Sequence, residues 1–120
     1  MIFDDDTEIF TILDYIVQDN GWQLQCRINC DNLLEEVRVV KPDLILMDNR
    51  IPETGGIVAT QALKKEEDLK DIPVIYFSAT NNIEKLAAQA GADSFIAKPF
   101  DLDDLERVIK SYLEQSRSIL

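Results

Sequence analysis

The chain has 120 residues, of which 46% are hydrophobic and 29% charged, and its formal net charge is -11 at pH 7. This length is enough for one domain with one hydrophobic core, so we assign residues 1–120 to a single domain. The negative charge argues against nucleic-acid binding by this domain alone, because contacts to phosphates need clustered lysine and arginine. It favours a cationic partner or a metal ion.

Features that the sequence lacks exclude several classes of protein and of catalytic site. No apolar run approaches the ~20 residues that cross a bilayer, and the first residues lack the basic start and apolar core of a signal peptide. We therefore expect a cytoplasmic protein without membrane contact. The chain has no histidine, which excludes Ser-His-Asp and Cys-His catalysis. Cys26 and Cys30 are expected to be reduced thiols, because they cannot complete a zinc site alone.

Strand and helix patterns alternate from the start of the chain. Met1–Phe3 resembles the end of a first strand. Apolar residues at helical spacing after Thr7 predict a helix that stops at Asn20-Gly21. Residues 22–28 alternate apolar and polar side chains, which predicts a half-exposed edge strand. A second helix follows and ends at Lys41-Pro42.

The stretch from Asp43 to Pro52 organises the rest of the chain. Four apolar residues, Leu44 to Met47, lead directly to Asp48. Such a run is typical of a strand that is buried on both faces of a parallel sheet. The strand should end at Asp48, because an unpaired carboxylate is costly to bury. The carboxyl end of a central parallel strand is where open α/β sheets bind their ligands.

The remaining segments continue the alternation. Their expected order is helix 57–67, strand 74–78, helix 83–90, strand 94–97 and helix 102–116. We expect Val58 and Leu102 to face the core and the charge-dense segment 64–71 to be solvated. Five strands that alternate with five helices predict a doubly wound α/β domain, with a parallel sheet and helices on both of its faces.

Polar residues end four of the five expected strands. They are Asp4-Asp5, Asp48, Ser78 and Lys98. All strands of a parallel sheet finish on the same side, so these groups should meet at one edge. Neighbouring carboxylates repel one another, and a hard divalent cation such as Mg²⁺ relieves that repulsion. One carboxylate could then act as a nucleophile on phosphorus.

These motifs, in this order and spacing, resemble the receiver domain of bacterial two-component response regulators over essentially all 120 residues. The motifs are Asp4-Asp5, the stretch Asp43 to Asp48, Pro52, Gly56, Ser78-Ala79 and Ala97-Lys98-Pro99-Phe100. The resemblance implies a (βα)5 flavodoxin-like fold of the chemotaxis-regulator type. In that fold a five-stranded parallel sheet has the order 2-1-3-4-5.

The resemblance also implies a phosphoacceptor and a metal site. Asp48 would accept a phosphoryl group from a histidine kinase or a histidine phosphotransfer protein. Asp5 would bind Mg²⁺ directly, Asp4 mainly through water, and the backbone carbonyl of Arg50 would be a further ligand beside Asp48. Mn²⁺ could substitute for Mg²⁺.

Three further residues are assigned roles by the resemblance. Ser78 would donate a hydrogen bond to a phosphoryl oxygen, and Lys98 would pair with the phosphoryl group or, before phosphorylation, with Asp48. Phe95 takes the place of the family's switch aromatic, and plain packing is its other interpretation. The Lys98-Pro99 bond is a candidate cis peptide.

The function implied is a signalling switch in a phosphorelay. Phosphorylation would alter the face built from the fourth helix, fifth strand and fifth helix, which would bind an unknown output domain or protein. The chain would be a monomer or a dimer that forms on phosphorylation. Self-catalysed phosphorylation and hydrolysis of the aspartyl phosphate would be its only catalysis. Two alternatives are an unphosphorylated pseudo-receiver that acts as a docking module and a haloacid-dehalogenase-type phosphatase. Against the phosphatase, the threonine in Asp4-Asp5-Asp6-Thr7 follows too closely.

Overall fold

The computed structural model describes the chain from residue 1 to residue 117, and its side chains to residue 114, so residues 118–120 of the expected domain lie outside it. Strands and helices alternate five times, as the sequence predicts. In chain order they are β1 Ile2–Phe3, α1 Glu8–Asn20, β2 Cys26–Arg27, α2 Leu33–Val40, β3 Ile45–Asp48, α3 Gly56–Lys65, β4 Val74–Ser78, α4 Ile83–Ala90, β5 Ser94–Ala97 and α5 Leu102–Arg117.

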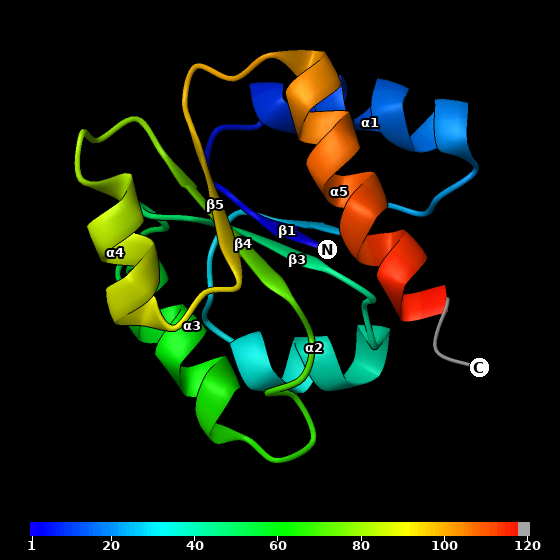
Figure 1. The fold of residues 1–120 in the computed structure, drawn as a ribbon. Coiled ribbons are helices and arrows are strands. Elements are labelled where there is room, and N and C mark those ends of the chain that lie inside the picture. Colours follow the sequence, from blue (N-terminus) through cyan, green and yellow to red (C-terminus); the bar gives the residue numbers. More distant parts are fainter. Residues whose placement is uncertain (118–120) are drawn as a thin grey trace.

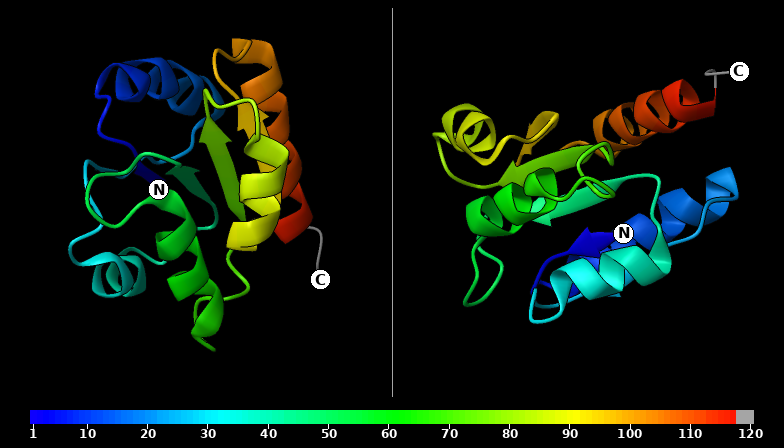
Figure 2. Two further views of the ribbon diagram at one scale, coloured as in Figure 1. Left: turned by 90° about the vertical axis from the view of Figure 1, so that its left-hand side faces the viewer. Right: turned by 90° about the horizontal axis from the view of Figure 1, so that it is seen from below.

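The five strands form one parallel sheet in the order β2-β1-β3-β4-β5. Helices α1 and α5 cover one face of this sheet, and α2, α3 and α4 cover the other (Figure 1, Figure 2). This arrangement confirms the expected doubly wound, flavodoxin-like fold and its strand order. Within the described residues, none of the helices combines the length and apolar character needed to cross a membrane.

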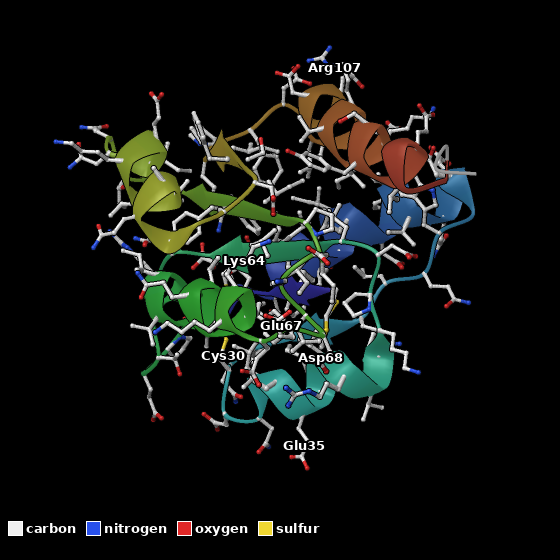
Figure 3. The ribbon with its side chains drawn as sticks, turned by 60° about the horizontal axis from the view of Figure 1, so that its bottom comes forward. Cys30, Glu35, Lys64, Glu67, Asp68 and Arg107 are labelled. Carbon is white, nitrogen blue, oxygen red and sulfur yellow. The ribbon has the colours of Figure 1, made fainter. Side chains whose placement is uncertain are left out.

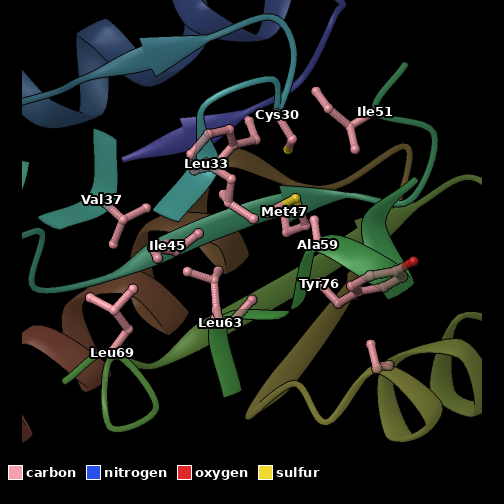
Figure 4. Close-up of a cluster of buried hydrophobic side chains, with 14 of the residues drawn as sticks. Cys30, Leu33, Val37, Ile45, Met47, Ile51, Ala59, Leu63, Leu69 and Tyr76 are labelled. Atoms are coloured by element: carbon pink, nitrogen blue, oxygen red, sulfur yellow. The ribbon is translucent and has the colours of Figure 1, made fainter. Parts of the chain in front are cut away.

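The two central strands, β3 and β4, carry the core. Every residue of both strands is buried. Figure 4 shows the layer between the sheet and helices α2 and α3, where Val37, Ile45, Met47 and Leu63 pack together. Burying each such side chain contributes roughly 1.5–3 kcal/mol. The continuous apolar run before Asp48 is therefore the strand that the sequence predicts.

The edge strand expected over residues 22–28 is wrong in extent. Strand β2 pairs with β1 only at Ile2↔Cys26 and Phe3↔Arg27, because β1 offers only two residues as partners. Before β2, the carbonyl of Gln25 still accepts the Ile2 N–H at 2.8 Å. Ile28 lies beyond the pairing and is exposed.

Two helix faces also differ from expectation. Val58 is 57% exposed, because the buried stripe of α3 is formed by Gly56, Ala59, Thr60 and Leu63, a spacing that leaves residue 58 outside. Leu102 is 51% exposed, and the part of α5 that contacts the core begins one turn later, at Leu105.

The charge-dense segment 64–71 is more than a solvated face. The Lys64 ammonium (Figure 3) donates hydrogen bonds to the carbonyls of Lys70 and Ile72, at 3.1 and 2.9 Å, and lies 2.8 Å from an Asp93 carboxylate oxygen. Leu69, within the same segment, is buried. The segment therefore folds back on α3 and is tied to the start of β5.

Gly56 allows the start of α3 to approach the end of β3. A Cβ atom at this position would lie 2.5 Å from the Asp48 carbonyl oxygen and 2.9 Å from the Asn49 Cα. Both are backbone atoms, which cannot move aside as a side chain would. We expect Gly56→Ala to destabilise the fold by about 3 kcal/mol, measured by urea unfolding.

Gly21→Ala is the matched control for this prediction. Gly21 has a φ of 70°, with free space around its Cα, so alanine there introduces only backbone strain of roughly 1 kcal/mol. If Gly56→Ala lowered stability no more than Gly21→Ala, the close approach of backbone atoms would be irrelevant to stability.

Candidate functional site

The carboxyl edge of the sheet gathers the polar residues that the sequence places at its strand ends. Asp4 and Asp5 follow β1, Asp48 ends β3, Ser78 ends β4 and Lys98 follows β5. Carboxylate oxygens of Asp4, Asp5 and Asp48 all lie within 4.8 Å of one another. Asp4 and Asp48 are almost fully buried, whereas Asp5 is exposed and opens the cluster to solvent.

Lys98 bridges the two buried carboxylates. Its Nζ lies 2.9 Å from Asp4 Oδ2 and 3.0 Å from Asp48 Oδ1, and it lies over the Phe77 ring at 4.8 Å from the centroid. Burial alone would lower the pKa of Lys98, but the hydrogen bonds to Asp4 and Asp48, together with the negative charges of these two residues, raise that pKa. Lys98 is therefore a permanent positive charge at this edge.

The fold disfavours the charged form of Asp4. Burial raises its pKa, and the charge of Asp48 adds to the effect. A hydrogen bond from the Asp6 N–H to Asp4 Oδ1, at 2.9 Å, and the Lys98 ammonium only partly offset this. One ammonium among three carboxylates leaves a net charge of −2 in an all-oxygen ligand set, which suits a hard divalent cation.

The turn between β3 and α3 fixes the orientation of Asp48. The Arg50 N–H donates to Asp48 Oδ2 at 2.9 Å, so each oxygen of this carboxylate has its own partner. The Asn49 N–H donates to the Phe77 carbonyl, and the Asn49 carbonyl accepts the Gly56 N–H, both at 3.0 Å. The backbone of Arg50 is thereby held beside the carboxylates. The proposed role of its carbonyl as a ligand stays a prediction.

Ser78 and Phe95 take different positions. Ser78 is buried at the end of β4, where its carbonyl accepts the Lys98 N–H at 2.8 Å and its Oγ accepts the Thr80 N–H at 3.2 Å. Phe95, on β5, is 41% exposed and lies on the surface of the sheet's edge strand. Its role as a switch is untested. The Lys98-Pro99 bond is cis, as expected.

Sequence reasoning missed one polar contact beside the phosphoacceptor candidate. Tyr76, which is fully buried in β4, donates its hydroxyl to the Asn49 Oδ1. Burial, with the nearby Asp48 charge, raises the pKa of Tyr76 to about 12, so the hydroxyl stays protonated. The available signal was a tyrosine inside a buried strand whose other residues before Ser78 are apolar, because a buried phenol needs a partner.

The sequence and the fold of this chain are similar to those of known proteins. A family model described as response regulator receiver domain matches residues 1–110. The polar-differentiation response regulator DivK of Brucella anthropi is 32% identical over 115 residues, which are 94% of each chain. The signal receiver domain of a signal transduction histidine kinase from Syntrophus aciditrophicus has a TM-score of 0.86 at 27% identity, over 99% of this chain and 92% of that chain.

A third relative supports the fold alone. It is the receiver domain of sensor histidine kinase PA1611 from Pseudomonas aeruginosa PAO1, whose structure has a magnesium ion coordinated in the active site cleft. It has a TM-score of 0.77 at 24% identity, over 94% of each chain.

The raised pKa of Asp4 predicts how stability depends on pH without divalent metal. A carboxyl whose folded-state pKa is raised favours folding below its unfolded pKa, near 3.9, and loses that contribution as pH rises through the folded value. Asparagine stays neutral throughout. We therefore expect the free energy of unfolding of Asp4→Asn to rise relative to that of the wild type between about pH 4 and pH 8, in urea unfolding with a chelator present.

Asp71→Asn serves as the control, because Asp71 is exposed and is not part of the cluster. Its stability relative to the wild type should be the same at both pH values. A constant or shrinking advantage of Asp4→Asn as pH rises would contradict the unfavourable burial of Asp4.

Proposed function

The chain belongs to the response regulator receiver domain family, and from this membership we propose that it is a phosphoacceptor switch whose Asp48 takes a phosphoryl group from a histidine of another protein. One observation carries the proposal. Asp48, at the end of the central strand β3, has the Lys98 ammonium 3.0 Å from one oxygen and the carboxylates of Asp4 and Asp5 beside it. Residues 1–120 contain no histidine, and we propose a histidine kinase or a histidine phosphotransfer protein as the donor.

The bonds that change in the transfer step involve only Asp48, the phosphoryl group and the donor histidine. An Asp48 oxygen attacks phosphorus, a P–O bond forms, the P–N bond to the donor histidine breaks, and its electron pair returns to the imidazole. Lys98 neutralises charge on the phosphoryl oxygens, and the buried Ser78 hydroxyl donates a hydrogen bond to one of them. The tie between Arg50 N–H and Asp48 Oδ2 orients the nucleophile.

Mg²⁺ is the cofactor that we propose for this cluster. The ligands would be Asp4, Asp5, Asp48 and the Arg50 carbonyl. One ammonium does not neutralise three carboxylates, so this set of oxygen ligands carries excess negative charge that a cation would balance. When bound, the cation neutralises charge that develops on the phosphoryl group and orients it. Mn²⁺, which also prefers oxygen ligands, would substitute. The PA1611 receiver domain, which shares this fold, holds magnesium in its cleft.

The consequence of phosphorylation would be a change in partner preference. An aspartyl phosphate adds negative charge and acceptor oxygens that compete for Lys98 and Ser78. Both residues lie beside β5, whose Phe95 is exposed on the α4-β5-α5 side of the domain. Attack of water on the acyl phosphate would reset the switch. Beyond this self-catalysed phosphorylation and hydrolysis, we propose no enzymatic activity.

A phosphorylation assay tests the proposal. The full chain is incubated with Mg²⁺ and acetyl phosphate, and phosphate is measured by intact-protein mass and mapped to a residue. We expect one phosphoryl group on Asp48 in the wild type and in the exposed-site control Asp71→Asn, and none in Asp48→Asn or with chelator. Lys98→Met should slow the reaction roughly 100-fold, because it removes charge stabilisation.

Three results would reject this function. Equal phosphorylation of Asp48→Asn, or phosphate on Asp4, would support a phosphatase-like nucleophile instead. A wild type that neither binds Mg²⁺ nor takes up phosphate would favour a docking module that is not phosphorylated.

A further inference from the structure

The contact between Tyr76 and Asn49 joins the core to the turn that follows the phosphoacceptor candidate. Parallel pairing places Tyr76 beside Met47 and Phe77 beside Asp48. The Tyr76 ring packs in the cluster between the sheet and α3, and its hydroxyl lies at the edge of that cluster (Figure 4). There it donates a hydrogen bond to the side-chain carbonyl of Asn49. A fully buried residue of β4 thus reaches the residue directly after Asp48.

Asn49 is held at three points. Its N–H donates to the Phe77 carbonyl, its own carbonyl accepts the Gly56 N–H, and its side chain accepts the Tyr76 hydroxyl. The N–H of the next residue, Arg50, donates a hydrogen bond to Asp48 Oδ2 at 2.9 Å. A displacement of Asn49 would therefore move the backbone of Arg50 relative to the carboxylates.

Gly56 leaves the space that this contact needs. A Cβ atom on residue 56 would lie 2.9 Å from the Tyr76 hydroxyl oxygen, as well as 2.5 Å from the Asp48 carbonyl oxygen. The hydroxyl therefore sits in a gap bounded by the end of β3, the turn and the first residue of α3. In this position it can restrain the turn directly.

We propose that Tyr76 and Asn49 are positioning residues, whose hydrogen bond holds the β3–α3 turn in the geometry that binds the divalent cation. The inference rests on the proposed function, because it concerns the same metal site. Their side chains are bonded to each other, and we assign neither of them to the ligand set of Asp4, Asp5, Asp48 and the Arg50 carbonyl. They act through the backbone of Arg50, as the partners that support metal ligands do in other sites, where their loss typically lowers metal affinity 10–100-fold.

Removal of the Tyr76 hydroxyl should lower the affinity for Mg²⁺ and leave the phosphorylation chemistry unchanged. Tyr76→Phe keeps the buried ring and removes only the hydroxyl, and Asn49 is partly exposed, so water can replace the bond without loss of the fold. We expect a Mg²⁺ dissociation constant about tenfold larger, measured by isothermal titration calorimetry. The phosphorylation rate at saturating Mg²⁺ should stay within about twofold, because the reacting groups are unchanged.

A double-mutant cycle separates a direct partnership from two independent effects. If the bond is the cause, Asn49→Ala weakens Mg²⁺ binding by a similar factor. The Tyr76→Phe/Asn49→Ala double variant then has a Mg²⁺ dissociation constant no larger than that of the single variant that binds less tightly. The matched control is Tyr112→Phe, which also removes a hydroxyl hydrogen bond, here to the Asp93 carbonyl at 3.1 Å, before the amino end of β5. Its Mg²⁺ affinity should equal that of the wild type.

Three results would overturn the inference. They are an unchanged dissociation constant in Tyr76→Phe, losses that multiply in the double variant, and an equal loss in Tyr112→Phe. If Tyr76→Phe fails to fold by circular dichroism, Asn49→Ala decides alone, and an unchanged affinity in it overturns the inference. A wild type that binds Mg²⁺ and is phosphorylated on Asp48 while the variants behave like it rejects the inference and leaves the proposed function intact.

Discussion

The ammonium of Lys98 between Asp4 and Asp48 is the interaction on which the carboxyl edge of the sheet depends. Two unit charges 4 Å apart interact by roughly 4 kcal/mol at an intermediate dielectric, so the two buried carboxylates would strongly oppose folding if left alone. Lys98 reaches both, at 2.9 and 3.0 Å, from the end of β5. The ends of β1, β3 and β5 therefore form one electrostatic unit, which still carries an excess of negative charge through Asp5.

The parts of this unit were predictable because parallel sheets follow simple rules. A continuous apolar run must be a buried strand, its first carboxylate must stand at the strand's end, and all ends share one edge. That reasoning located Asp48, Ser78 and Lys98. It did not show that Lys98 contacts both buried carboxylates, because the reach of a side chain across two strands depends on packing. The length of β2 escaped prediction for a related reason, since an edge strand extends only as far as β1 pairs with it.

The contact between Tyr76 and Asn49 lay further from sequence reasoning. The residues are 27 positions apart and belong to different elements, and their approach depends on the register that pairs Met47 with Tyr76. A local pattern can show that a buried tyrosine needs a partner, but it cannot say which one. Val58 and Leu102 show the same limit, because apolar residues at helix positions are buried only where another element covers them.

The connections of Lys98 explain how a change at Asp48 could spread. Its ammonium is shared between Asp4 and Asp48, while its backbone N–H donates to the Ser78 carbonyl at 2.8 Å. A phosphoryl group on Asp48 would draw the ammonium away from this arrangement, since one ammonium cannot keep the same geometry towards three acceptors. The strain would then reach the ends of β4 and β5 together, because the backbone hydrogen bond ties them. Phe95 lies on β5, three residues before Lys98. A shift of Lys98 on phosphorylation would therefore be transmitted along a short stretch of backbone to the exposed surface of β5.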